Sequence, residues 1–234
     1  SPNFAMTLSN LAFLHQKMEE MEVALPMYIR AKDIYGNTMG KDHSNYAIAL
    51  QNLAIFYDKN GKYKLALPLI LEAKEILEKN NTTTNPNYAL LLDNLANLYQ
   101  SLGDYTSAMP YYLEAKDIKI KTLGEKHFYY AMSLNNIAVL YRVRGDFKSA
   151  KPLFQQSKDL LGELFGENDQ KYIGSINILA DINLKLKDYP EAWTVINENL
   201  GIITKTSLSE DINIDQNWKK KLEKTEFPSI LHLI

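Results

Sequence analysis

Few side chains in this sequence have the types and spacing that catalysis needs. Residues 36–41 have the glycines and lysine of a phosphate-binding loop, but the glycines are one residue too close, and Asp42 stands where magnesium binding needs Ser or Thr. His15, His43 and His127 have no second His or carboxylate at the spacing of a metal site or a catalytic triad. We therefore expect no enzymatic activity, no bound metal and no cofactor.

The composition of the chain argues against several further classes of function. The chain has 234 residues, and its 26 Lys and Arg against 28 Asp and Glu give a net charge of -2. No positive excess exists to neutralise a nucleic-acid backbone or an anionic membrane surface. No apolar run reaches the length of a membrane span, and no cysteine is present for disulfides or thiolate chemistry. We expect a soluble cytoplasmic protein with no nucleic-acid or membrane partner.

One polar residue type recurs at a fixed interval. Asparagine stands at positions that are each 42 residues apart, followed every time by Leu or Ile and then by Ala: Asn10, Asn52, Asn94 and Asn136. An internal period of this length is the signature of a repeat array. Five repeats, starting near residues 5, 47, 89, 131 and 173, form an array over residues 1–206. Residues 1–4 match the tail of a preceding repeat, so we expect the chain to be a segment of a longer array.

The spacing inside one repeat indicates its secondary structure. In the fourth repeat Leu134, Ile137 and Tyr141 follow the i, i+3, i+7 spacing of one helix face. Gly145 breaks this series, and a second apolar series begins at Ala150. Each repeat is therefore predicted to be two antiparallel helices. An Asp suited to an N-cap precedes the second helix in the last three repeats: Asp104, Asp146 and Asp188.

The segments LNNIAVLY, GDF and LGEKH of the third and fourth repeats resemble the tetratricopeptide (TPR) signature, and the 42-residue period is similar to its kinesin light chain subtype. The resemblance implies an all-α fold, a right-handed superhelical solenoid of five TPR-like helical hairpins. It also implies a non-catalytic scaffold that binds a protein or an extended peptide in a concave groove. Similar bacterial arrays are often sensor or regulatory arms of larger proteins, some with a CHAT-type peptidase domain.

A strip of amide and apolar side chains falls opposite the core on the first helix of each repeat. In stacked hairpins the first helices line the concave side, so this strip is the candidate site. Asn side chains both donate and accept hydrogen bonds, which suits the main chain of an extended peptide. The candidate peptide-binding residues are Asn10, Asn52, Asn94, Asn136, Ile48, Leu90, Met132, Ile55, Asn97, Val139, Lys59 and Arg142.

Alternatives stay open at this point. The asparagines could hydrogen-bond the neighbouring repeat as a structural ladder, and the apolar residues of the strip could pack against adjacent first helices. The array as a whole could be a structural one that self-associates end to end. The charges near the strip have mixed sign, so they predict no charge for the partner.

The repeat pattern ends near Thr206. We expect residues 207–234 to hold a polar linker, a short capping helix over residues 216–224, and the start of a further apolar element. In that helix Trp218 and Leu222 are spaced i, i+4, so both can lie across the open end of the fifth repeat.

Overall fold

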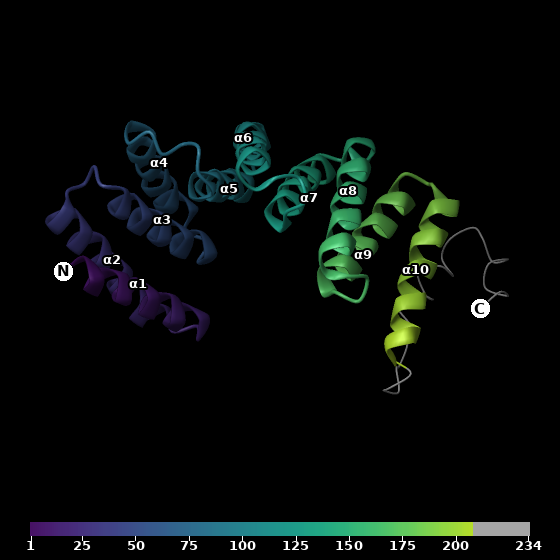
Figure 1. The fold of residues 1–234 in the computed structure, drawn as a ribbon, viewed down its shortest axis with the longest axis horizontal. Helices are drawn as coiled ribbons and strands as arrows, with labels where there is room; N and C mark the ends of the chain where they lie inside the picture. The colour runs from purple at the N-terminus through teal and green to yellow at the C-terminus, as the bar shows by residue number, and fades with distance from the viewer. Residues whose placement is uncertain (208–234) are drawn as a thin grey trace.

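The chain folds into an elongated row of helical hairpins, shown in Figure 1 as an arch with the N-terminal hairpin at one end. The structure is a computed structural model and describes residues 1–207. The helices in this part of the chain are α1 (Pro2–Lys17), α2 (Met21–Met39), α3 (Ser44–Lys59), α4 (Tyr63–Lys79), α5 (Pro86–Ser101), α6 (Tyr105–Leu123), α7 (Phe128–Val143), α8 (Phe147–Phe165), α9 (Gln170–Lys185) and α10 (Tyr189–Ser207). Each helix packs on the next one along the chain. The predicted all-α solenoid of five hairpins is confirmed, while the expected capping helix lies outside the described residues.

Side-chain caps set where several second helices begin. The Asp104 carboxylate accepts a hydrogen bond from the Ser107 amide at 3.0 Å, and Asp146 accepts one from the Ser149 amide at 3.1 Å. Hydrogen bonds from these serines lower the pKa of both carboxyl groups below the usual range. Each carboxylate satisfies an amide that has no partner within the helix, as the sequence predicted.

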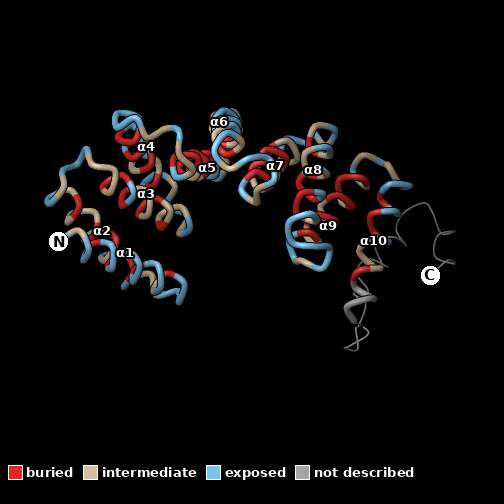
Figure 2. Tube along the Cα trace, in the orientation of Figure 1, coloured by how far each residue is buried: buried red, intermediate tan, exposed pale blue. Residues whose placement is uncertain are grey.

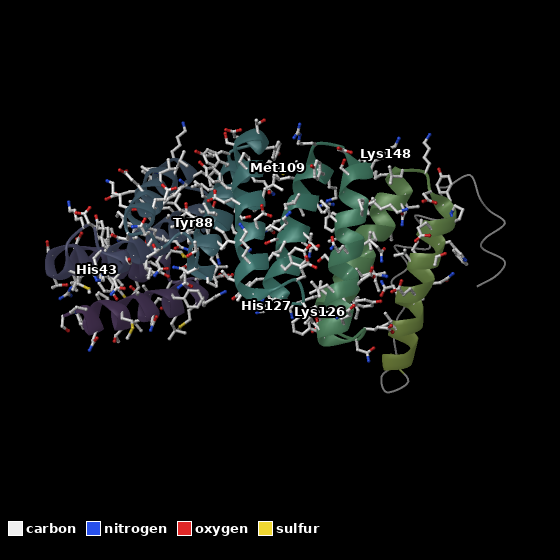
Figure 3. The ribbon with its side chains drawn as sticks, turned by 45° about the horizontal axis from the view of Figure 1, so that its top comes forward. His43, Tyr88, Met109, Lys126, His127 and Lys148 are labelled. Carbon is white, nitrogen blue, oxygen red and sulfur yellow. The ribbon has the colours of Figure 1, made fainter. Side chains whose placement is uncertain are left out.

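Two of the histidines cap first helices. The Nδ1 atom of His43 accepts a hydrogen bond from the Asn45 amide at 3.1 Å, and Nδ1 of His127 accepts one from the Tyr129 amide at 3.1 Å. Figure 3 shows His43 and His127 along one edge of the array, with Met109 and Lys148 along the opposite edge. These histidines therefore have a structural role in the loops that join one hairpin to the next.

The turn inside each hairpin needs one residue with a positive φ. Glycine takes this position in the three middle repeats, with φ of 69° at Gly61, 79° at Gly103 and 78° at Gly145. The equivalent residues of the terminal repeats are Glu19 and Lys187, which adopt φ of 63° and 60° despite their side chains. Glycine reaches this region without steric penalty, so the terminal turns are the more strained ones.

Small residues hold the two helices of every hairpin close together. An alanine in the first part of each second helix is buried, and the series is Ala24, Ala66, Ala108, Ala150 and Ala192. Because alanine has only a methyl group, the facing first helix can approach closely. Figure 2 shows the buried stretches distributed along the whole row rather than gathered at one centre. The core is thus a series of buried clusters between stacked hairpins along the row.

Candidate peptide-binding groove

The first helices of the hairpins lie next to one another. Helix α1 contacts α3, and α3 contacts α5, in addition to the contacts between consecutive helices. In Figure 1, α3 and α5 lie toward the inner side of the arch, and α4 and α6 toward its outer side. The concave side is therefore built from the first helices, which carry the strip of amide and apolar residues.

None of the twelve candidate residues is fully buried. Four are exposed, namely Asn10, Ile48, Lys59 and Asn97, and eight are half-buried, namely Asn52, Ile55, Leu90, Asn94, Met132, Asn136, Val139 and Arg142. Buried core positions lie on the other faces of the same helices. The strip is thus accessible along its length.

The four periodic asparagines make no side-chain hydrogen bond within residues 1–207. A structural ladder would need their amides to be paired with a neighbouring helix, and no such bond is present for Asn10, Asn52, Asn94 or Asn136. Other asparagines do pair in this way: Asn199 donates to Asn177 at 2.8 Å. The periodic amides therefore keep their donors and acceptors free.

A pocket of about 160 Å³ opens between α3 and α5, with α4 behind it. Its walls are Ala54, Ile55, Asp58, Lys59, Ile70, Asn94, Asn97 and Leu98. The apolar walls suit a side chain, and the amides and charges suit the polar groups beside it. Four of the twelve candidates meet here, and the other eight lie elsewhere on the strip.

The amide of Asn97 is oriented by the neighbouring second helix. The Tyr112 hydroxyl donates to Asn97 Oδ1 at 2.5 Å, and Gln100 Oε1 lies 3.2 Å from the same hydroxyl. Burial raises the pKa of Tyr112, with a smaller contribution from the nearby Asp93 and Asp58 carboxylates, so the hydroxyl stays a donor. Because Oδ1 of Asn97 is already engaged, its NH₂ group is the part that remains to donate into the pocket.

Asp58 gives the pocket a half-buried carboxylate. Burial raises its pKa, while a hydrogen bond from Ser101 and the charge of Lys59 act in the opposite direction. The sequence reasoning did not select Asp58. A signal existed, because three of the four equivalent positions in the other repeats hold polar side chains, namely Gln16, Gln100 and Arg142, and only the fifth repeat has Leu184 there.

The other residues that the sequence reasoning missed are apolar. Ala54 and Leu98 belong to the core pattern of their helices, and Ile70 comes from the second helix of repeat two. A helix wheel of the first helices alone cannot show that a second helix forms the back of the pocket.

Toward its C-terminal end the strip includes an ion pair between two helices of the chain. Arg142 on α7 lies 4.0 Å from Asp181 on α9, and both side chains are partly exposed. Met132, Asn136 and Val139 share α7 with Arg142 but line no part of the pocket. The strip therefore carries apolar and amide groups as far as α7, and the ion pair of Arg142 with Asp181 links it to α9.

Within the described part of the chain, no group of three or more His, Cys, Asp or Glu side chains is placed to hold a metal ion. No helix among residues 1–207 is both long enough and apolar enough to cross a membrane.

Sequence comparison identifies the repeats. The model of the tetratricopeptide repeat matches residues 3–79 and 87–163. The chain belongs to the tetratricopeptide repeat family. A comparison with curated proteins finds no match. The resemblance drawn from the residues is thereby confirmed, and the TPR fold commonly forms a protein-interaction scaffold and is typically non-catalytic.

Solved structures agree on the fold. A kinesin light chain-like protein of Podosopora anserina with nearly identical TPR-like repeats has a TM-score of 0.78 and 22% identity, covering 89% of this chain and 99% of that one. BtubC (BKLC) from P. vanneervenii has a TM-score of 0.80 and 21% identity, covering 91% of this chain and 84% of that one. At this identity the likeness establishes the solenoid alone.

Proposed function

We propose that this TPR array is a non-catalytic scaffold that binds an extended peptide segment of another protein along its concave side. The observation that carries the proposal is the row of unpaired amides on first helices, with the pocket between α3 and α5 beside them. Unpaired amides on successive first helices provide donors and acceptors for a peptide main chain, and the pocket provides an apolar seat for one side chain.

The pocket is the proposed anchor point. Ile55, Ile70 and Leu98 form apolar walls, and the amides of Asn94 and Asn97 line the same pocket. An aliphatic side chain of the partner would replace water there, which is favourable in proportion to the apolar area covered. The cytoplasm is the proposed compartment, and this rests on the sequence expectation alone.

The test uses peptides selected from a random library on the wild-type chain. The double variant Asn94→Ala with Asn136→Ala should bind the selected peptides roughly tenfold more weakly, because each lost hydrogen bond contributes about 0.5–1.5 kcal/mol. Its melting temperature should stay close to that of the wild type, since neither amide is bonded within the fold.

Asn37→Ala is the matched control. Asn37 is an exposed asparagine on α2, a second helix, so its removal should leave peptide affinity unchanged. Unchanged affinity of the double variant would contradict the assignment of these amides to the groove. A large drop in its melting temperature would instead support the structural ladder.

A further inference from the structure

The pocket between α3 and α5 lies where one second helix lacks an aromatic ring. Four residues after the repeated alanine, the second helices of repeats one, three and four carry buried rings, those of Tyr28, Tyr112 and Phe154. Repeat two has Ile70 at this position, and Ile70 lines the pocket. We therefore compare the pocket with the places that the rings fill in the other repeats.

The walls of the pocket correspond to residues that hold a tyrosine ring elsewhere. In repeat one the Tyr28 ring is buried in one cluster with Ala12 and packs on Phe56 of α3, with ring centroids 5.6 Å apart. The residues one repeat later, Ala54 and Leu98, line the pocket. Its volume of about 160 Å³ is comparable to the roughly 150 Å³ of an apolar cavity that accommodates benzene.

The hydroxyl of the missing tyrosine has a place in the pocket as well. In repeat three the Tyr112 hydroxyl donates to Asn97 Oδ1 at 2.5 Å and lies 3.2 Å from Gln100 Oε1. The equivalents of these two acceptors in repeat two are Ile55 and Asp58, and both line the pocket. Asp58 therefore stands where the other repeats place a residue that faces a tyrosine hydroxyl.

Asp58 has lost the donor that its equivalents have. In repeat one the Tyr28 hydroxyl donates to Oε1 of Gln16, the equivalent of Asp58, at 2.9 Å. With Ile70 in place of tyrosine, Oδ1 of Asp58 is buried and has no hydrogen-bond partner among the described residues. The fifth repeat also has isoleucine here, but its equivalent of Asp58 is Leu184, which needs no donor. A ligand that brings a donor to Asp58 removes the cost of an unpaired buried acceptor.

We infer that the pocket receives a tyrosine side chain of the bound peptide, whose ring packs on Ile70 and Leu98 and whose hydroxyl donates to Asp58. This inference rests on the proposed function, because the tyrosine comes from the peptide in the groove. An aliphatic side chain would cover the same walls but would leave the Asp58 oxygen without a donor. The peptide thus supplies the phenol that repeats one and three supply from their own second helices.

The first test uses p-cresol, which is the tyrosine side chain without its main chain, and toluene, which lacks the hydroxyl. Each is titrated into the whole protein and followed through the amide chemical shifts of α3 and α5. The preference for p-cresol over toluene should be about tenfold greater in the wild type than in Asp58→Ala, because only the wild type offers the acceptor. An equal preference in both proteins, or no binding of p-cresol, would overturn the inference.

A second variant tests whether the pocket is the place of a tyrosine. Ile70→Tyr supplies the ring and the hydroxyl from the chain itself, as repeats one and three do. It should abolish the binding of p-cresol without lowering the melting temperature. Undiminished binding of p-cresol to this variant would place the ligand elsewhere and overturn the inference.

The peptides selected on the wild-type chain test the source of the phenol. They should share one tyrosine, and changing it to phenylalanine should weaken binding about tenfold to the wild type but not to Asp58→Ala. Selected peptides without a shared tyrosine would overturn the inference and leave the proposed function intact. Binding of p-cresol with no peptide selected would overturn the proposed function and the peptide source together, and would leave a site for a free phenol.

Discussion

Two neighbouring junctions between repeats of this array differ in the chemistry of the side chains buried there. Between repeats two and three, Leu77 of α4 and Leu91 of α5 are both buried among apolar neighbours. Between repeats three and four, the equivalent residues are Lys119 of α6 and Ser133 of α7. The Lys119 side chain is only 1% exposed, and its Nζ donates to the Asp93 carboxylate and, at 2.8 Å, to Ser133 Oγ.

Apolar contacts are present at both junctions, so the difference lies in the buried polar groups. One buried apolar cluster extends from Ala5 in α1 to Ala115 in α6, and another joins Ala96 and Ala108 to Ile137 and Leu140 of α7 across the third junction. Apolar contacts are non-directional, so many hairpins could stack at the second junction. Across the third junction Lys119, paired with Asp93 of its own hairpin, donates to the Ser133 hydroxyl of the next hairpin. This directional bond needs one geometry, so the third junction accepts a narrower set of neighbouring hairpins. All repeats share the same 42-residue period. The residues buried between neighbouring repeats nevertheless differ, so one repeat cannot take the place of another.

Breaking the ion pair should have the largest effect. Lys119→Met leaves the Asp93 carboxylate buried without its partner, and burial already raises the pKa of that carboxyl against the influence of Lys119. We expect the free energy of unfolding to fall by roughly 3–5 kcal/mol, measured by urea denaturation.

A triple variant is the control for that change. Asp93→Gln, Lys119→Leu and Ser133→Leu give the third junction the residues of the second one and remove the buried charges of Asp93 and Lys119. Replacing a buried pair by apolar residues is often neutral or stabilising, so this variant should unfold at or above the wild-type urea midpoint. A triple variant as unstable as Lys119→Met would show that the junction cannot be repacked.

Truncating the apolar junction should have the next largest effect. Leu91→Ala opens a cavity at a fully buried site and should lower the free energy of unfolding by roughly 2–5 kcal/mol. The equivalent change Ser133→Ala removes an acceptor of Lys119 and should lower it by about 1–3 kcal/mol. Urea midpoints of the two variants measure the contrast, and equal losses would contradict a difference between the junctions.

The smallest expected effect is a difference in pH dependence. Glu78 at the second junction accepts hydrogen bonds from Lys74 at 2.6 Å and from the Tyr88 hydroxyl of the next repeat at 3.0 Å. These bonds, that of Lys74 first, lower the pKa of Glu78 below its usual value. A lowered carboxyl pKa contributes stability above the unfolded-state pKa of about 4.3, and this stability is lost as the pH falls through the folded-state value.

Glu78→Gln should therefore be less stable than the wild type at neutral pH, and the gap should close toward pH 3. Thermal melting across this range measures it. Glu75→Gln is the matched control, since Glu75 pairs with Lys79 on the same exposed helix surface and makes no bond to α5. An equal pH effect for both variants would show that the contact between repeats contributes nothing.

The sequence by itself was sufficient for the regular features of this protein. The 42-residue period, the helical spacing of apolar residues and the buried alanines repeat five times, and each depends on neighbours close in the chain or one period away. The caps at Asp104 and Asp146 were predicted for the same reason, because a capping bond spans only three residues. Accessible positions of the concave strip also followed from helix geometry.

Only the tertiary structure decided the features that involve three helices at once. The pocket depends on Ile70, which approaches from α4 behind the strip of α3 and α5. Lys119 lies in the charged run of α6 and gives no sign in sequence that it is buried, because its partners Asp93 and Ser133 belong to two other helices. Periodicity assigns a residue to a face of its own helix, whereas burial and pairing depend on which faces of several helices meet in space.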